Sequence, residues 1–140
     1  MSGTGTESRA IAHASPSLAL IKYWGKVPGG TNLPATSSLA VTLEGLRTTT
    51  AVGPGAGRSD EVRLNGTLED PGAHAAMIDR FRELAGTAGP VSVESRNTFP
   101  TAAGLASSSS GFAALALALD AYYQTGLDRS ELSALAREGS

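Results

Sequence analysis

Hydrophobic and polar positions alternate along several short stretches of the chain, and this period of two residues is typical of half-buried β-strands. The first half of the sequence contains five candidate strands, at residues 11–14, 18–23, 38–44, 47–52 and 61–64: the first two are apolar, the third alternates and the fourth is β-branched. Pro16 separates the first two, and Asn65-Gly66 follows the fifth as a strong hairpin signal. The pattern therefore predicts an antiparallel meander, with a flexible surface loop at residues 53–59.

A helical period of three and four residues begins after Asp70-Pro71, where Asp can cap a helix and Pro can occupy its first turn. The apolar face of this helix would comprise Met77, Ile78, Phe81, Leu84 and Ala85. We interpret the helix as architectural, ending at Gly86. His74 and His13 are expected to be solvated surface histidines, because neither has a second histidine or an acidic cluster at the spacing of a metal site.

The segment from residue 90 to residue 126 predicts a strand, a loop of small residues and a helix, in that order. Residues 90–96 alternate as in a strand, residues 97–111 are rich in Ser, Ala and Gly, and residues 112–122 have helical spacing. Such a loop can bind an anion, because the first N–H groups of a helix are unpaired and its dipole favours negative charge. We interpret it as a phosphate-binding loop, although it is neither a Walker A loop nor a GxGxxG motif. The alternatives are a linker or a helix merely capped by serine.

Composition limits the classes of protein to which the chain can belong. Its 140 residues suit one domain, and the absence of cysteine excludes disulfides, thiolate metal sites and cysteine nucleophiles. Thirteen acidic and eleven basic residues give a net charge of -2, so we expect no nucleic-acid or membrane partner. The first ten residues lack a signal-peptide pattern and no apolar run could span a bilayer, so we expect a cytoplasmic protein.

Both lysines of the chain, Lys22 and Lys26, lie in the motif LIKYWGK, whereas the other nine basic residues are arginines. Lysine is a compact point charge that suits a phosphate group. We therefore expect this motif to supply the cation that the serine-rich loop lacks. The alternative is that both are ordinary surface lysines.

Seven stretches of the sequence together resemble a known family: residues 19–26, 33–34, 37–39, 42–43, 48–50, 64–66 and 99–108. They are similar to the N-terminal part of the diphosphomevalonate decarboxylases, which belong to the GHMP kinase superfamily. The resemblance covers residues 11–140 and implies an α+β fold, with an antiparallel-rich sheet backed by helices as in the N-terminal domain of GHMP kinases. It also implies a flexible leader at residues 1–10 and an absent C-terminal half, without which this chain is expected to be inactive.

The resemblance also implies roles for individual residues. In the loop P-x3-G-L-x-S-S, the ATP contacts would come from Pro100, Ala103, Gly104, Leu105, Ala106, Ser107 and Ser108. Ser107 or Ser108 could also meet Mg²⁺. Tyr23, Lys26 and Ser140 would bind the substrate, and Lys22 would lie at the reacting centre, with the catalytic aspartate beyond the end of this chain.

The implied reaction is the decarboxylation of mevalonate 5-diphosphate to isopentenyl diphosphate with ATP and Mg²⁺, in the mevalonate pathway of isoprenoid biosynthesis. Phosphoryl transfer needs mainly positioning and charge stabilisation, which suits backbone N–H groups, lysine and serine. This chain has Thr36 and Ser17-Leu18 where the family usually has Asn and Asn-Ile. A decarboxylase or 3-kinase of mevalonate or its monophosphate, and a nucleotide-binding module without turnover, therefore stay open. The full-length enzyme could be a homodimer.

Overall fold

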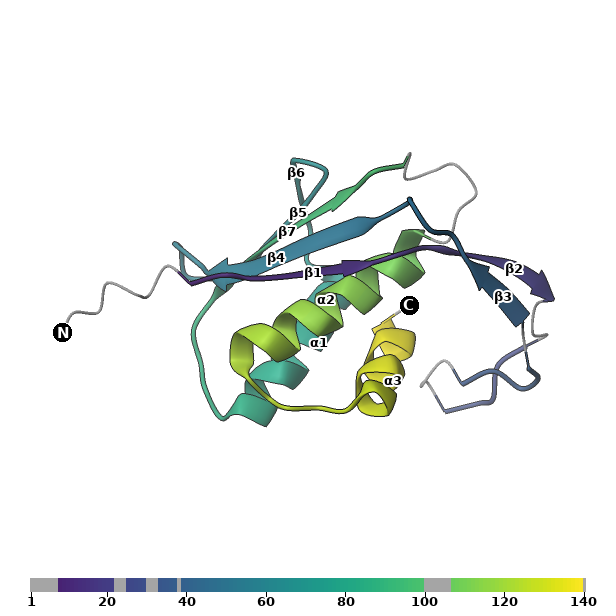
Figure 1. Ribbon diagram of the computed structural model, residues 1–140. Coiled ribbons are helices and arrows are strands. Elements are labelled where there is room, and N and C mark those ends of the chain that lie inside the picture. The colour runs from purple at the N-terminus through teal and green to yellow at the C-terminus, as the bar shows by residue number, and fades with distance from the viewer. Residues whose placement is uncertain (1–7, 22–24, 30–32, 38, 100–106, 140) are drawn as a thin grey trace.

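The computed structural model describes residues 8–21, 25–29, 33–37, 39–99 and 107–139. Within these residues the fold is α+β, as the family resemblance implied, and has two layers. Figure 1 shows the sheet as one layer and the helices packed together against one of its faces. Among the described residues, none of the helices combines the length and the apolar character needed to cross a membrane.

The described strands form two sheets. The main sheet has five strands in the order β1-β4-β7-β5-β6. Their bounds are β1 Ala10–Ala14, β4 Thr48–Pro54, β5 Glu61–Leu64, β6 Thr67–Glu69 and β7 Val91–Asn97. The other sheet is the antiparallel pair of β2 Ser17–Ile21 and β3 Leu39–Thr42.

The predicted meander is wrong, because most strands that are neighbours in the sequence are not neighbours in the main sheet. β1 pairs with β4, β7 lies between β4 and β5, and the pairing of β5 with β7 is parallel. The predicted hairpin is confirmed: Asn65 and Gly66 join β5 to β6 with φ values of 50° and 85°. β4 also continues through Gly53 and Pro54, two residues into the predicted loop.

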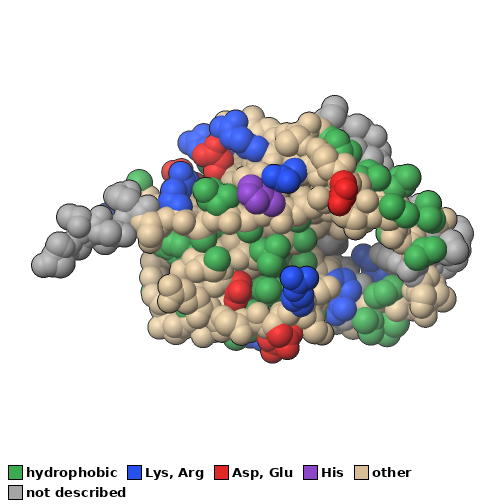
Figure 2. All heavy atoms as spheres, viewed as in Figure 1, with side chains coloured by type: hydrophobic (Ala, Val, Ile, Leu, Met, Phe, Trp, Pro, Cys, Tyr) green, Lys and Arg blue, Asp and Glu red, His purple; other side chains and the backbone are tan. Residues whose placement is uncertain are grey.

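The β2–β3 pair extends beyond the end of the main sheet, away from α1 and α2 (Figure 1). Its apolar side chains Leu18, Leu20, Leu39 and Val41 are exposed, Leu20 by 60%. Figure 2 shows hydrophobic side chains gathered over this arm of the molecule. Two strands without a covering layer cannot bury their apolar side chains, which explains the exposure.

The helices are α1 Gly72–Ala85, α2 Ser107–Tyr123 and α3 Arg129–Gly139. In α1 the predicted apolar face is confirmed for Met77, Ile78 and Phe81, which are buried. Leu84 and Ala85 are exposed instead. The buried stripe of α1 therefore ends at Phe81, just over one turn before the C-cap Gly86.

The predicted central helix is confirmed as α2, which packs on β1, β4, α1 and α3. Its buried residues lie on several sides of the helix and include Phe112, Ala114, Leu115, Ala116, Ala118 and Leu119. A helix that is apolar around most of its circumference is one that other elements surround. Across from it, Val52, Val62, Val91 and Val93 form the buried face of the main sheet.

The sequence analysis did not predict α3. Asp128 and Glu131 form a reciprocal capping box at its start: Asp128 Oδ1 accepts from the Glu131 N–H at 2.8 Å, and Glu131 Oε2 accepts from the Asp128 N–H at 2.9 Å. Leu132 then inserts into the core. The signal was present as Asp-x-x-Glu directly before an apolar residue.

A largely buried ion pair fixes α1 to the beginning of β7. Arg82 Nη2 lies 2.5 Å from Asp60 Oδ2, and Arg82 Nη1 donates to the Gly89 carbonyl at 2.8 Å. Asp60 Oδ1 also accepts from the Val91 N–H at 2.9 Å. The hydrogen bond to Asp60 is the main reason that the pKa of Arg82 is raised. This anchor lies at the end of β7 opposite to the serine-rich loop.

Candidate functional site

The serine-rich segment has the predicted order of strand, loop and helix. β7 ends at Asn97, and α2 begins at Ser107. The first turn of α2 contains no acidic residue, so its own side chains do not neutralise the positive end of the helix dipole. The geometry at the start of α2 therefore suits an anion.

Several predicted phosphate contacts lie outside the described residues. They are Pro100, Ala103, Gly104, Leu105 and Ala106. Ser107 and Ser108 begin α2, and their side chains lie outside the description. The roles of these seven residues toward ATP and Mg²⁺ stay predictions.

One buried hydroxyl connects the two sides of the serine-rich loop. Thr48 Oγ1, on β4, donates to Asn97 Oδ1 at 2.7 Å and lies 2.8 Å from Ser110 Oγ. Because the single Thr48 hydrogen goes to Asn97, the Ser110 hydroxyl is the donor in the second bond. The last of the four serines thus fastens α2 to the sheet.

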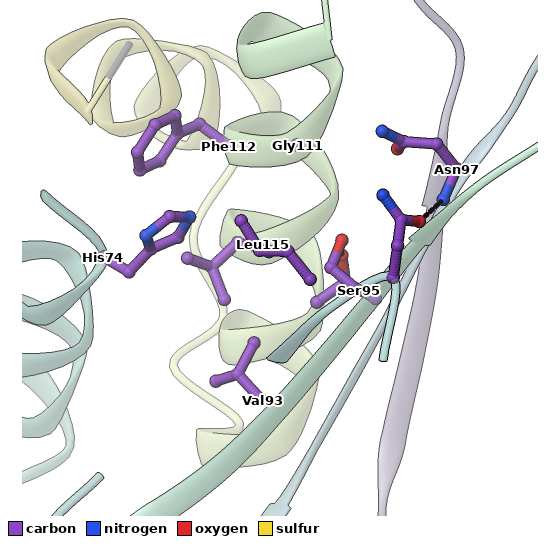
Figure 3. Close-up of a pocket in the computed structure, with 10 residues that line it drawn as sticks. His74, Val93, Ser95, Asn97, Gly111, Phe112 and Leu115 are labelled. Carbon is purple, nitrogen blue, oxygen red and sulfur yellow. Dashed lines mark hydrogen bonds between the residues drawn. The ribbon is translucent and has the colours of Figure 1, made fainter. Parts of the chain in front are cut away.

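A cavity of about 210 Å³ lies beside this network, between the main sheet, α1 and α2. Its lining comes from Thr50, Leu64, Asn65, His74, Val93, Ser95, Asn97, Gly111, Phe112 and Leu115. Figure 3 shows His74 and Phe112 on one side of the cavity and Ser95 and Asn97 on the other. The described ends of the serine-rich segment, Asn97 and Gly111, both line it.

Hydrogen bonds hold the polar side of the cavity in place. The Asn97 N–H donates to Asn65 Oδ1 at 2.9 Å, and the hydroxyls of Thr50 and Ser95 lie 2.9 Å apart (Figure 3). The other walls are apolar, with Leu64, Val93 and Leu115. Apolar walls with a few fixed polar groups suit a flat, partly polar ring system.

His74 is not the solvated surface histidine that we predicted. It is half-buried, its Nδ1 lies 3.2 Å from the Pro71 carbonyl oxygen, and its ring stacks on Phe112 with centroids 4.9 Å apart. The architectural interpretation of α1 stays a prediction, and the structure adds that the first turn of α1 brings His74 to the cavity wall. His13 is exposed as predicted, with Nδ1 2.9 Å from Thr49 Oγ1.

The lysine motif is described only in part. Lys22, Tyr23 and Ser140 lie outside the described residues. Lys26 is exposed and forms an isolated antiparallel β-bridge with Pro34. The roles of these four residues toward a substrate stay predictions. No group of three or more His, Asp or Glu side chains that could hold a metal ion occurs among the described residues.

Sequence reasoning missed the cavity because five separate segments form it. A readable signal was present in the strands, where Thr50 and Ser95 occupy the same inward-facing positions as Val52 and Val93. Polar side chains on the buried face of a strand need hydrogen-bond partners, so they indicate an internal site with polar groups.

Comparison with known proteins identifies relatives over nearly the whole chain. The family model described as the diphosphomevalonate decarboxylase-like N-terminal domain matches residues 14–140. Diphosphomevalonate decarboxylase from Ganoderma lucidum is 43% identical, across 94% of this chain and 38% of its own length. Phosphomevalonate decarboxylase from Haloferax volcanii is 38% identical, across 94% of this chain and 42% of its own length.

A solved structure supports the same family relationship. The mevalonate diphosphate decarboxylase from Enterococcus faecalis, solved in a study of its mevalonate diphosphate mediated ATP binding mechanism, has a TM-score of 0.83 and 39% identity. The match covers 94% of this chain and 42% of that one. The chain therefore spans about two fifths of the length of its relatives. It belongs to the family of the diphosphomevalonate decarboxylase-like N-terminal domain.

Proposed function

We propose that this chain is the nucleotide-binding part of an ATP-dependent decarboxylase, which converts mevalonate 5-diphosphate to isopentenyl diphosphate. One observation carries the proposal for this chain: the cavity is lined by residues on both sides of the serine-rich loop, Asn97 and Gly111. A ligand with phosphates at the start of α2 would place an attached ring system in this cavity. A nucleotide has that chemistry.

The size of the cavity supports a base rather than a whole nucleotide. Pockets that enclose a complete drug-sized ligand have volumes of roughly 300–1,000 Å³. The cavity here, at about 210 Å³, is smaller. The triphosphate would then lie outside it, over the N-terminus of α2.

The residues at that end have chemistry suited to phosphoryl transfer. Backbone N–H groups and the dipole of α2 would stabilise the negative charge of the phosphates, and Ser107 or Ser108 would contribute a hydroxyl to a phosphate or to Mg²⁺. When bound, Mg²⁺ would neutralise charge that develops on the transferred group. Thr48 would hold the loop in register through Asn97 and Ser110.

The lysine motif would bind the second substrate. Lys26 and Tyr23 would hold the terminal phosphates of the phosphorylated mevalonate, Lys22 would lie nearer to the transferred phosphoryl group, and Ser140 would contact the same substrate. The remaining catalytic groups would come from the part of the enzyme that this chain does not include. A cytoplasmic location and a homodimeric enzyme stay predictions.

Two alternative functions have specific support. The Haloferax volcanii relative is a phosphomevalonate decarboxylase, so mevalonate 5-phosphate is the second candidate substrate. A nucleotide-binding module without turnover is the other, because the cavity and the start of α2 support nucleotide binding and do not by themselves support turnover.

Two assays test the proposal. Titration calorimetry of the 140-residue chain with ATP and Mg²⁺ should show saturable binding. In a complete enzyme that begins with this sequence, CO2 release should require ATP and should be faster with mevalonate 5-diphosphate than with mevalonate 5-phosphate. Binding without CO2 release from either substrate would favour the module without turnover, and the reverse substrate preference would favour the monophosphate enzyme.

A further inference from the structure

We infer that His74 makes the cavity selective for a 6-aminopurine, such as adenine, over a 6-oxopurine. This inference rests on the proposed nucleotide site and adds to it the residue that recognises the base. It comes from the geometry of one side chain that sequence analysis had assigned to the surface.

Two contacts fix the orientation of the His74 ring. On one side it stacks on Phe112, with an angle of 19° between the ring planes and 4.9 Å between their centroids. At its edge, Nδ1 lies 3.2 Å from the Pro71 carbonyl oxygen. A side chain held by packing and by a hydrogen bond presents its remaining polar atom in a defined direction.

The partner of Nδ1 determines the tautomer of the neutral ring. A carbonyl oxygen can only accept, so Nδ1 must carry the hydrogen that His74 donates to Pro71. The other nitrogen, Nε2, then has a lone pair and is an acceptor. Figure 3 shows the ring projecting from α1 into the cavity, with one nitrogen toward α1 and the other turned away from it.

On the opposite side of the cavity, the side-chain oxygens already have hydrogen-bond partners within the protein. Asn97 Oδ1 accepts from Thr48, Asn65 Oδ1 accepts from the Asn97 N–H, and the Thr50 and Ser95 hydroxyls bond to each other. The structure gives Nε2 of His74 no partner among the described residues. Nε2 of His74 is therefore an acceptor in the cavity lining that has no protein partner in the described part of the chain and can accept a hydrogen bond from a ligand.

An acceptor at this place distinguishes two classes of purine. The 6-amino group of adenine donates a hydrogen bond, whereas the 6-oxo group of hypoxanthine or guanine accepts one. A 6-oxo group facing Nε2 would place two lone pairs against each other and leave both atoms without a partner. Phe112 and Leu115 would contact the ring faces of either base without preference.

Binding of ATP and ITP to the 140-residue chain tests this inference, since the two nucleotides differ only at the 6-position and its neighbouring ring nitrogen. Titration calorimetry with Mg²⁺ should give a Kd about two- to tenfold lower for ATP than for ITP, the value of one neutral hydrogen bond. His74→Phe keeps an aromatic ring for stacking and removes the acceptor, so the two Kd values should become equal. His74→Gln keeps an acceptor oxygen and should retain part of the preference.

His13→Phe is the matched control, because His13 is exposed and lies outside the cavity lining. It should leave the ATP to ITP ratio unchanged. Equal Kd values in the unsubstituted chain would overturn the inference, and so would an unchanged ratio in folded His74→Phe. If that variant does not fold, a ratio in His74→Gln that exceeds the unsubstituted value would overturn it. Binding of neither nucleotide would instead contradict the proposed function itself.

Discussion

The Thr48 hydroxyl on β4 lies 2.8 Å from the Ser110 hydroxyl on α2, and both side chains are buried. The same Thr48 oxygen donates to Asn97 at the end of β7. One side chain of a neighbouring strand thus holds the residues on both sides of the serine-rich loop. The start of α2 can face a ligand in a fixed position because its first turns are tied to the sheet.

Thr48→Val should therefore destabilise the chain by about 1–3 kcal/mol, because it leaves Ser110 and Asn97 each without one buried partner. Thr49→Val is the matched control on the same strand. Among the described residues, the Thr49 side chain bonds only to the exposed His13 side chain, so its loss should change stability by less than about 0.5 kcal/mol. Urea denaturation measures both. Equal effects of the two substitutions would contradict the role of Thr48.

The Arg82–Asp60 pair should also be important for stability. Arg82→Met removes one partner of a largely buried pair and leaves the Asp60 carboxylate without its cation, which should cost about 3–5 kcal/mol. The control is Arg80→Met on the same helix, because Arg80 and Glu83 form a mostly exposed pair at 3.8 Å. That substitution should have an effect near zero. A loss of less than about 1 kcal/mol in Arg82→Met would contradict this account.

The pKa of Tyr123 leads to a prediction of how the free energy of unfolding changes with pH in the alkaline range. Burial raises the pKa of Tyr123, and the nearby Arg82 guanidinium offsets part of this effect. The folded chain therefore keeps the phenol proton at pH values where the unfolded chain, with a pKa of about 10, has lost it. This contribution to the free energy of unfolding is present below about pH 10 and is lost as pH rises from there through the raised pKa.

Tyr123→Phe removes this contribution, so its stability should fall less steeply above about pH 10 than that of the unsubstituted chain. At neutral pH the substitution should be neutral or slightly stabilising, because the Tyr123 hydroxyl is buried with no hydrogen-bond partner among the described residues. Urea denaturation at about pH 8 and at about pH 10.5 separates the two effects. Identical pH dependence in both proteins would contradict the prediction.

The proposed roles of the two lysines lead to different kinetic defects in a complete enzyme. Lys26→Ala should mainly raise the KM for the phosphorylated mevalonate, because it removes a charge that binds substrate and transition state alike. The rise should correspond to a loss of about 1.5–3 kcal/mol of binding free energy. Lys22→Ala should lower kcat more than it raises KM. Steady-state kinetics, with folding checked by circular dichroism, measures both. Near-normal constants for both variants would mean that these are surface lysines.

The sequence predicted local structure better than it predicted which strands pair with each other. Residues 61–66 specify a strand and a turn by themselves, because the positive φ of Asn65 and Gly66 is a local property. The insertion of β7 between β4 and β5 depends on contacts between residues about 30 to 50 positions apart, which a period of two does not encode.

The candidate site was predictable to a similar degree. The order of strand, loop and helix followed from residues 90–126, since each part has its own composition. The cavity did not follow, because His74, Asn65 and Phe112 come together only through packing. His74 precedes Met77, Ile78 and Phe81 by three, four and seven residues, so helical spacing already placed it on the buried stripe of α1. The sequence analysis missed this signal, and the packing of α2 then places Phe112 against the ring.

Mapping of amide chemical shifts in the isotope-labelled chain, during titration with ATP and Mg²⁺, tests the nucleotide site most directly. The largest changes should occur in the cavity lining and at the start of α2, with His74, Asn97 and Gly111 among the affected residues. Glu131 on α3 and Leu68 on β6 should change little, since neither lies in that lining. Saturable shifts confined to this cavity are the result that we predict. Absence of binding at millimolar nucleotide, or shifts centred on another surface, would contradict the proposal that this chain binds the nucleotide of the decarboxylase.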